Sequence, residues 1–428
     1  MSEILVLSLG TSPEPIVQCI TRLRPRRVVF VCSEGTRSLV DDVRRQVRIE
    51  AFDPDRDVEV LASNDIDQLH SVYCRCRDLL QRVRREMPAA RISVDYTGGT
   101  KTMATGLGLA AIDDGRVILT LTTIERRKPG ESAITGNSIP IPVQSGAIQF
   151  RRFFTDGLQP LLQRHNYAAA QAAVAIQLQL HHDEAATSSL RRLDGLLLAF
   201  DAWDRWDLDH AESLLRDHAS DSVVRDSFLF PLQRVIQSRN LLTSAGSPRL
   251  QRSIHGFEAV EDLLLNAARR ACQERYDDAV GRLYRSLELT AQLLLLIDHG
   301  GIRTGDLQLE LLPDALRAAW EEKRNRDKNR IELALTFSFD LLADLGDPVG
   351  EEWRSRRSEF IDALQVRNQS LLAHGFRPVT YADWQRLDGV LGGFLRTLLG
   401  LRRGDLAPLR QLPVTLAELG LNDATSSS

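Results

Sequence analysis

A glycine-rich turn between a predicted strand and a predicted helix constrains the fold of this chain more than any other feature. The turn, Asp95-Tyr-Thr-Gly-Gly-Thr-Lys-Thr-Met103, follows Arg91–Val94, an apolar and β-branched stretch that is typical of a buried strand. After it, Met103, Leu107 and Ala111 recur at helical spacing among small residues, as expected for a helix packed closely on a sheet. The turn therefore predicts an α/β unit.

The residues of this turn predict a binding site for phosphate or ribose oxygens. Gly98 and Gly99 can expose backbone N–H groups, and the N-terminus of the following helix favours an anion. Hydroxyl groups and one positive charge surround them, from Thr97, Thr100, Lys101 and Thr102. The alternative is a tight turn with solvated threonines. A Walker A loop is disfavoured, because Thr100 and Asp95 stand where that loop requires glycine.

Strand and helix patterns alternate over residues 1–150. Helical patterns separate the predicted strands, and the longest of them covers Asp65–Met87. Such βαβ repeats indicate an open, mostly parallel, Rossmann-like sheet. The predicted strands are Ile4–Leu9, Val28–Cys32, Val58–Leu61, Arg91–Val94 and Val117–Thr123, with a β-rich tail at Ile134–Phe150.

Three turns of this sheet are predicted to meet at one edge, because ligands of such sheets bind beyond the carboxyl ends of the strands. They are Gly10-Thr11-Ser12, the turn that contains Ser33, and Thr97–Thr102, and all contain small hydroxylated residues. At the first turn, Ser12 followed by Pro13 is also typical of an ordinary helix cap. The sequence leaves capping and ligand contact open there.

The composition excludes several classes of protein. The longest apolar runs fall far short of a membrane span, and Ile4–Leu9 resembles a strand rather than a signal peptide. The five cysteines lack the paired spacing of a zinc site or a disulfide framework, so we expect no metal and a reducing cytoplasm. The formal net charge of −4 disfavours an extended basic surface for nucleic acid.

A second group of candidate residues lies in the C-terminal region, where residues 155–410 show almost only helical patterns. A helix is predicted at Trp353–Ala373, with Gly375 as its C-cap. Arg367 and His374 are seven residues apart, so on one helix they would share a face within about 20°. Arginine can bind a scissile phosphate, and histidine can exchange protons near neutral pH, as metal-free RNA cleavage requires. Asn368 is placed to position either one. The alternative is ordinary capping by His374 and a surface charge at Arg367.

Together the two groups resemble a known family. The turn Asp95–Met103 on a Rossmann-like sheet resembles a CARF domain, the sensor of CRISPR-associated ancillary proteins, and Gly10-Thr11-Ser12 matches its ligand-contacting turn. Arg367-Asn368 followed by His374 is similar to the Arg-x(4–6)-His signature of HEPN ribonucleases. The resemblance implies a CARF domain at 1–150, a helical linker at 151–255, an all-α HEPN domain at 256–410 and a tail at 411–428.

This resemblance also implies a function. The protein would be a cytoplasmic, homodimeric endoribonuclease of type III CRISPR defence that cleaves single-stranded RNA without metal and leaves a 2′,3′-cyclic phosphate. No cofactor is expected; the activating ligand would be cyclic tetra- or hexa-adenylate, bound by the three turns. The alternative is a CARF sensor whose helices only dimerise or recruit a partner. The sequence leaves open the ring size, the RNA preference and whether the sensor degrades its activator.

Overall fold

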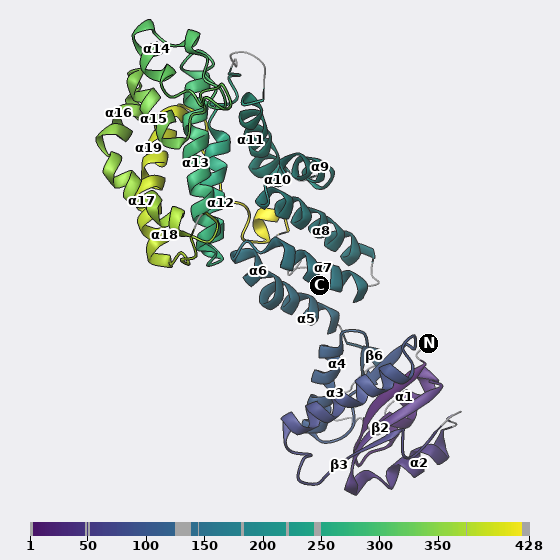
Figure 1. Ribbon diagram of the computed structural model, residues 1–428. Helices are drawn as coiled ribbons and strands as arrows, with labels where there is room; N and C mark the ends of the chain where they lie inside the picture. Colours follow the sequence, from purple (N-terminus) through teal and green to yellow (C-terminus); the bar gives the residue numbers. More distant parts are fainter. Residues whose placement is uncertain are drawn as a thin grey trace. The chain divides into compact units, whose positions relative to one another are not determined.

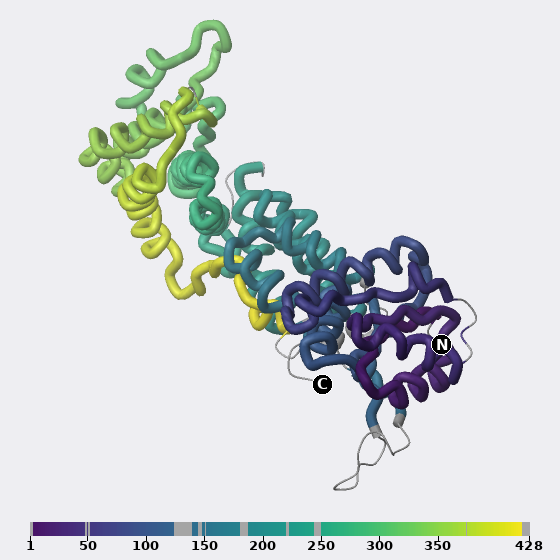
Figure 2. The backbone as a smooth tube through the Cα atoms, turned by 90° about the horizontal axis from the view of Figure 1, so that it is seen from below, coloured from purple at the N-terminus to yellow at the C-terminus, as the bar shows by residue number. Residues whose placement is uncertain are grey.

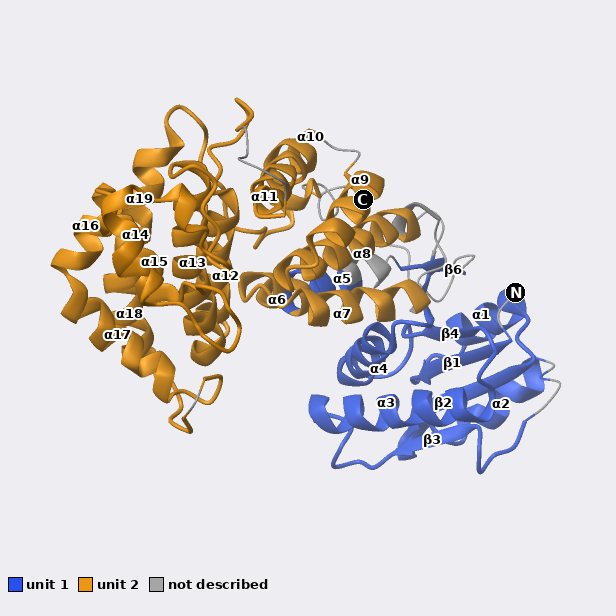
Figure 3. Cartoon of the chain, turned by 45° about the horizontal axis from the view of Figure 1, so that its top comes forward, with its two compact units in different colours: residues 1–156, 423–428 blue, residues 157–422 orange. Residues whose placement is uncertain are grey.

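The computed structural model describes residues 3–47, 49, 52–124, 138–143, 145–180, 184–219, 222–243, 250–373 and 375–421. The chain divides into two compact units, unit 1 over residues 1–156 and unit 2 over residues 157–422 (Figure 3). We describe each unit by itself. Whether unit 2 divides further into a linker and a HEPN domain at residue 255 stays a prediction.

Unit 1 is built on one mixed sheet. The strand order is β3-β2-β1-β4-β5-β6, in which neighbours pair in parallel except for antiparallel β6. This arrangement confirms the predicted Rossmann-like fold (Figure 1). The strands are β1 (Ile4–Leu9), β2 (Arg27–Ser33), β3 (Val58–Leu61), β4 (Ile92–Asp95), β5 (Ile118–Ile124) and β6 (Ser138–Pro142).

Helices cover both faces of the sheet because side chains alternate along each strand. Leu5 and Leu7 of β1 pack in the core that includes Ile16, on one face, while Ile4 and Val6 pack against the opposite core. The first face carries α1 (Glu14–Leu23) and α2 (Leu39–Gln46), and the second carries α3 (Leu69–Glu86) and α4 (Lys101–Asp114). Helix α3 is shorter than the predicted Asp65–Met87.

The predicted β-rich tail at Ile134–Phe150 is wrong in its second half. Strand β6 covers Ser138–Pro142, but Ser145–Arg152 forms helix α5, and residues 134–137 lie outside the described part. Helix α5 contacts α4, where the Gln149 side chain donates a hydrogen bond to the Ile112 carbonyl and Arg152 pairs with Asp113. These contacts with α4 are tertiary, so the local apolar pattern did not reveal them.

Unit 2 is helical throughout its described part, which confirms the all-α prediction. Its first helices are α6 (Gln159–Gln163), α7 (Tyr167–Leu180), α8 (Glu184–Asp204), α9 (Leu208–His218), α10 (Ser222–Val224) and α11 (Phe230–Leu241). The later ones are α12 (Glu258–Cys272), α13 (Tyr276–Ile297), α14 (Asp314–Glu321), α15 (Leu335–Asp344), α16 (Pro348–Ser355), α17 (Arg357–Gln369), α18 (Tyr381–Leu387) and α19 (Gly393–Arg403).

The chain after α19 returns to the first helices of unit 2. Figure 2 shows this yellow segment running beside the teal helices. The Gln159 side chain donates to the Val414 carbonyl at 2.8 Å, and the Tyr167 hydroxyl donates to the Pro413 carbonyl at 2.9 Å. The Arg269 guanidinium of α12 donates to the Gln411 side chain at 2.6 Å. The returning segment therefore ties the early and late helices together.

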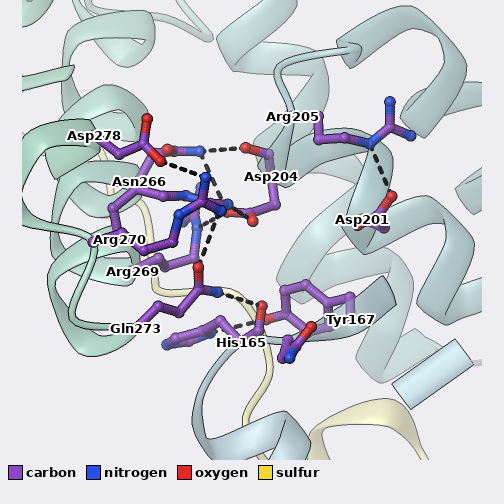
Figure 4. Close-up of polar contacts among 12 residues, drawn as sticks. His165, Tyr167, Asp201, Asp204, Arg205, Asn266, Arg269, Arg270, Gln273 and Asp278 are labelled. Atoms are coloured by element: carbon purple, nitrogen blue, oxygen red, sulfur yellow. Dashed lines mark hydrogen bonds and ion pairs between the residues drawn. The ribbon is translucent and has the colours of Figure 1, made fainter. Parts of the chain in front are cut away.

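A buried polar cluster joins α8 to α12 (Figure 4). The carboxylate of Asp204 accepts a hydrogen bond from Arg269 at 2.8 Å and pairs with Arg270, while its backbone carbonyl accepts from Asn266 at 2.8 Å. Arg269 is fully buried. Because losing one partner of a buried ion pair is costly, this cluster fixes the two helices to each other. The helices before residue 255 are thus part of one compact unit with α12.

Candidate functional site

Two of the three predicted turns contact each other at the point where the strand order of the sheet reverses. Chain connections lead from β1 to β2 on one side, while β4 lies on the other side of β1. The Ser8 hydroxyl donates to the Gly98 carbonyl at 2.6 Å. A Cβ on Gly98 would lie 2.2 Å from the Ser8 oxygen, and a Cβ on Gly10 would lie 2.7 Å from the Gly99 nitrogen. A larger residue than glycine would therefore clash at Gly10 and at Gly98. The two turns meet at a topological switch point, which is where open α/β sheets bind ligands.

The N-terminus of α4 lies in this region. Gly99 has φ +86°, which favours glycine, and the Thr100 hydroxyl caps the helix by accepting the Met103 N–H at 3.2 Å. Lys101 is exposed at the first position of the helix, Thr102 is half-buried, and no ion pair of Lys101 occurs among the described residues. A helix N-terminus beside an unpaired lysine favours an anionic ligand.

Asp95 holds the glycine-rich turn in place through hydrogen bonds, a role that the sequence did not reveal. Its buried carboxylate accepts hydrogen bonds from the Thr122 hydroxyl at 2.8 Å and from the Thr97 N–H at 3.0 Å. The Thr97 hydroxyl accepts the Thr122 N–H at 2.6 Å. Burial, together with the Asp95 charge, raises the pKa of the Cys19 thiol. Thr97 is therefore bound to β5 in this structure, which gives its hydroxyl a structural role.

The remaining predicted turn residues lie close to this point. The Ser33 N–H donates to the Thr36 hydroxyl at 3.1 Å, and that hydroxyl donates to the Leu9 carbonyl at 3.3 Å, so the turn after β2 is linked to the end of β1. Thr11 is exposed and Ser12 half-buried. Helix α1 has Pro13 at its N-cap without a side-chain cap, so the capping interpretation of Ser12 is wrong.

Arg367 lies in the last turn of α17 and is held by a tyrosine of α13. Its guanidinium carbon lies 4.1 Å from the centroid of the Tyr284 ring, and its Nη1 donates to the Asn368 side chain at 3.2 Å. Burial raises the pKa of Tyr284, and the nearby Glu288 raises it further. Stacking on the ring leaves guanidinium N–H groups at the edge, where they can bind a phosphate.

The predicted helix at Trp353–Ala373 is wrong at both ends. Helix α16 ends at Ser355, and α17 runs from Arg357 to Gln369, where Ser370 takes an extended conformation at the C-cap. The expected C-cap at Gly375 is therefore wrong, and the expected helical face shared by Arg367 and His374 stays a prediction. His374 itself lies outside the described residues.

The residues around position 374 fold back onto the end of α17. The N–H groups of Ala373 and Gly375 both donate to the Ser370 carbonyl at 3.1 Å, and the Arg377 N–H donates to the Gln369 carbonyl at 3.0 Å. A Cβ on Gly375 would lie 2.0 Å from the Gln369 oxygen, so this close approach requires glycine. Ala373, Gly375 and Arg377 are thus bound to the end of α17 by a loop rather than by a continued helix.

An apolar surface surrounds this loop. The exposed fractions are 65% for Leu371, 58% for Leu372, 90% for Phe376 and 56% for Tyr381. Exposed apolar side chains of this size are typical of surfaces that bind a partner when they form one patch.

Two further properties bear on the class of protein. Among the described residues, no group of three or more His, Cys, Asp or Glu side chains is arranged to hold a metal ion. In the same part of the chain, no helix is both long and apolar enough to cross a membrane.

Comparisons with known proteins agree with these observations. Residues 251–398 match the family model of the Csm6 HEPN domain. The structure of Enterococcus italicus Csm6 bound to cyclic hexa-2′-fluoro-hexa-dAMP is similar in fold, with a TM-score of 0.59 and 12% identity over 94% of each chain. No curated protein matches the sequence. The resemblance to CRISPR-associated CARF–HEPN proteins is thereby confirmed.

Proposed function

We propose that this protein is an endoribonuclease of type III CRISPR defence that cyclic oligoadenylate activates and that cleaves single-stranded RNA without a metal ion. The observation that carries the proposal is the match of residues 251–398 to a HEPN domain, together with Arg367 within that range. Cytoplasmic action follows from this role, because the RNA produced during infection is found there.

The sensing part of the proposal rests on the turns of unit 1. Thr11 and Lys101 are exposed, and Gly10 and Gly99 bring backbone groups of two turns together at the switch point. Hydroxyl, N–H and ammonium groups suit the ribose and phosphate oxygens of a cyclic nucleotide. The Enterococcus italicus protein binds a cyclic hexanucleotide of this kind. The candidate contacts remain Gly10, Thr11, Ser12, Ser33, Thr97, Gly98, Gly99, Thr100, Lys101 and Thr102.

The chemistry requires one arginine and one histidine. The 2′-hydroxyl of RNA attacks the adjacent phosphorus while His374 takes its proton, and the bond from phosphorus to the 5′-oxygen breaks as that oxygen gains a proton. Arg367 stabilises the charge that develops on the phosphate, with Asn368 orienting its guanidinium. The products are a 2′,3′-cyclic phosphate and a 5′-hydroxyl. No step requires a metal ion.

A homodimer completes this proposal. One arginine and one histidine per chain give two of each when two HEPN domains associate. The exposed Leu371, Leu372 and Phe376 beside the candidate site supply an apolar surface for that association. Activator binding would favour the dimer arrangement in which the site is competent.

The first experiment is cleavage of labelled single-stranded RNA in EDTA, with and without cyclic tetra- and hexa-adenylate. Cleavage that depends on one ring size supports the proposal and identifies the activator. Cleavage that disappears in EDTA and returns with Mg²⁺ contradicts the metal-independent mechanism. Binding of a ring without any cleavage favours the alternative, a sensor whose helices only dimerise or recruit a partner.

A further inference from the structure

A cavity in unit 2 has no role in the reaction described above. Its volume is about 720 Å³, and it lies between α13 and the loop that follows this helix. Pockets for small organic ligands measure about 300–1,000 Å³. The buried side chains of Leu296 and Ile302 contribute apolar surface to its lining, and none of the described residues that line it is aromatic. The cavity therefore has the size and the mixed polarity of a ligand site.

Helix α13 connects the cavity with the candidate catalytic arginine, because it carries Tyr284 beside Arg367 and also Arg285 and Gln292 in the lining. Tyr284, which contacts Arg367, is followed one turn along α13 by Glu288, and Glu288 accepts a hydrogen bond from Arg285 at 3.2 Å. Arg285 lines the cavity and also donates to the Gln292 side chain at 3.2 Å. Positions 284, 288 and 292 share one face of α13 and span about 12 Å along its axis. One row of side chains thus leads from Arg367 to the cavity.

Side-chain amides in the cavity are oriented by their neighbours. The Gln292 oxygen accepts from Arg285, which leaves its two N–H groups available to a ligand. The Gln308 amide nitrogen donates to Asp306 at 3.0 Å, which leaves its oxygen as an acceptor. Fixed donors and acceptors of this kind recognise the edges of nucleobases.

The positive and negative side chains in and beside the cavity are equal in number. Arg285 and Arg303 line it together with Asp306, and Glu288 pairs with Arg285. A phosphate site would require an excess of positive charge, whereas a base requires hydrogen bonds and a flat surface. The planar guanidinium of an arginine offers such a surface for base stacking when no aromatic ring is present.

We propose that this cavity binds a nucleobase of the single-stranded RNA substrate, on a nucleotide that flanks the phosphate bound by Arg367. The inference rests on the proposed ribonuclease function and adds a determinant of RNA sequence preference to it. A base held there fixes the register of the strand, so cleavage occurs at a defined distance from the preferred base.

Two variants test the cavity without altering Arg367. Gly305→Leu adds a bulky apolar side chain to its lining without a clash or strain, because an added Cβ there meets nothing within 4 Å and Gly305 does not have a positive φ. Gln292→Ala removes the two amide donors while leaving the cavity open. Gly400→Leu is a matched control, since Gly400 on α19 also has open space and lies outside the lining. Gln81→Ala, at an exposed glutamine of unit 1, is the control for Gln292.

The first readout is the base preference around the cleavage sites of a randomised RNA with saturating activator. The wild-type protein and both controls are expected to prefer one base at a fixed position. Gly305→Leu is expected to reduce that preference about tenfold, and Gln292→Ala to relax or change it. An unchanged preference and KM in both cavity variants would overturn the proposal while leaving the ribonuclease function intact.

The second readout separates the cavity from catalysis. Uncleavable 2′-O-methyl RNA of the same sequences is titrated and its fluorescence anisotropy measured. We expect Gly305→Leu to weaken binding about tenfold, the size of one lost base-stacking contact. If the wild-type protein binds the 2′-O-methyl RNA but does not cleave the unmodified RNA of the same sequence with activator present, the proposed function fails and the binding comparison still tests the cavity. Equal affinity of Gly305→Leu and Gly400→Leu would exclude a base in the cavity.

Discussion

The guanidinium of Arg367, near the end of α17, lies over the ring of Tyr284 in α13, with 4.1 Å between its central carbon and the ring centroid. Such a cation–π contact contributes about 0.5–2 kcal/mol and fixes the plane of the guanidinium. The edge of that plane carries the N–H groups that a phosphate requires. The contact therefore prepares the arginine for its proposed role before RNA binds.

Replacing Arg367 is expected to lower kcat for RNA cleavage. Arg367→Ala removes one group that stabilises the developing charge, which costs about 10²–10³-fold in rate. Arg367→Lys keeps the charge but loses the planar fork, so only partial activity is expected. Cleavage of labelled RNA with saturating activator measures both variants. Arg326→Ala, an exposed arginine of unit 2 without an ion pair in the described residues, serves as the control. Normal kcat in Arg367→Ala would remove this residue from the catalytic set.

His374→Ala is expected to abolish detectable RNA cleavage while cyclic oligoadenylate still binds. General acid–base catalysis contributes about 10²–10⁴-fold, and no other histidine follows His374 in the chain. Single-turnover cleavage and calorimetric binding of the activator are measured on the same preparation. Full activity in this variant would contradict the assignment of a HEPN-type site.

Lys101→Ala is expected to raise the activator concentration needed for half-maximal cleavage by about tenfold or more. A hydrogen bond to a charged group is worth about 1.5–3 kcal/mol, and no ion pair of Lys101 in the described residues competes with the ligand. Titration of the activator against the cleavage rate gives the value. Lys323→Ala in unit 2 is the control, and an identical titration curve for both variants would place the ligand elsewhere.

Most strands were predictable from the sequence because buried parallel strands have continuous apolar runs, as in Ile4–Leu9 and Arg27–Ser33. The turns at the switch point were predictable from their glycine and hydroxyl residues, because ligands of such sheets bind beyond the carboxyl ends of the strands. The order of the strands was not predicted and comes from their pairing in the structure. Helix α5 and the end of α17 were not, because they depend on tertiary contacts. The Gln369 carbonyl accepts from Arg377, and such a return of the chain leaves no periodic pattern.

Other parts of the candidate sites were also beyond sequence reasoning. The sequence indicated Arg367 but not Tyr284, since a contact between helices that are far apart in the chain has no local signal. Asp95 was noticed only because it excluded a Walker A loop, yet its buried carboxylate holds the turn. The sequence also did not reveal that the helices before residue 255 form one compact unit with α12. That unit is held by a cluster around Asp204, whose members are far apart in the chain.

Gly98→Ala is expected to destabilise unit 1 by about 1–3 kcal/mol. The new Cβ would lie 2.2 Å from the Ser8 carbonyl oxygen, so the two turns must separate. Gly108→Ala in α4 is the matched control, because its Cβ would meet only Tyr96 at 3.9 Å. Alanine in a helix is favoured over glycine by about 0.5–1 kcal/mol, so this control is expected to be stable. Urea unfolding measures both variants, and equal midpoints would show that the turns tolerate separation.

The stability of unit 2 is expected to fall as the pH is lowered from about 6.5 to 4. Burial, and then the charges of Arg269 and Arg270, lower the pKa of His165 from 6.5 to about 4. In this pH range the unfolded chain binds a proton that the folded chain does not, so acid favours unfolding. The Nδ1 of His165 lies 2.9 Å from the Tyr167 hydroxyl (Figure 4).

His165→Gln is expected to flatten this pH dependence. Urea unfolding at pH 7.5 and pH 5 measures the difference in the free energy of unfolding. The control is His210→Gln, at a histidine that is exposed on α9. If the pH dependence persists in His165→Gln and disappears in His210→Gln, His165 is not the group that takes up the proton on unfolding.

The returning segment after α19 determines which fragment of this chain folds by itself. The match to the HEPN model ends at residue 398, but Gln411, Pro413 and Val414 are bound to α12, α7 and α6. A protein cut to the matched range would expose the buried Arg269 and lose the partners of both helical groups. The compact unit extends over residues 157–422, so a fragment that is expected to fold by itself must keep the returning segment and both helical groups that it binds.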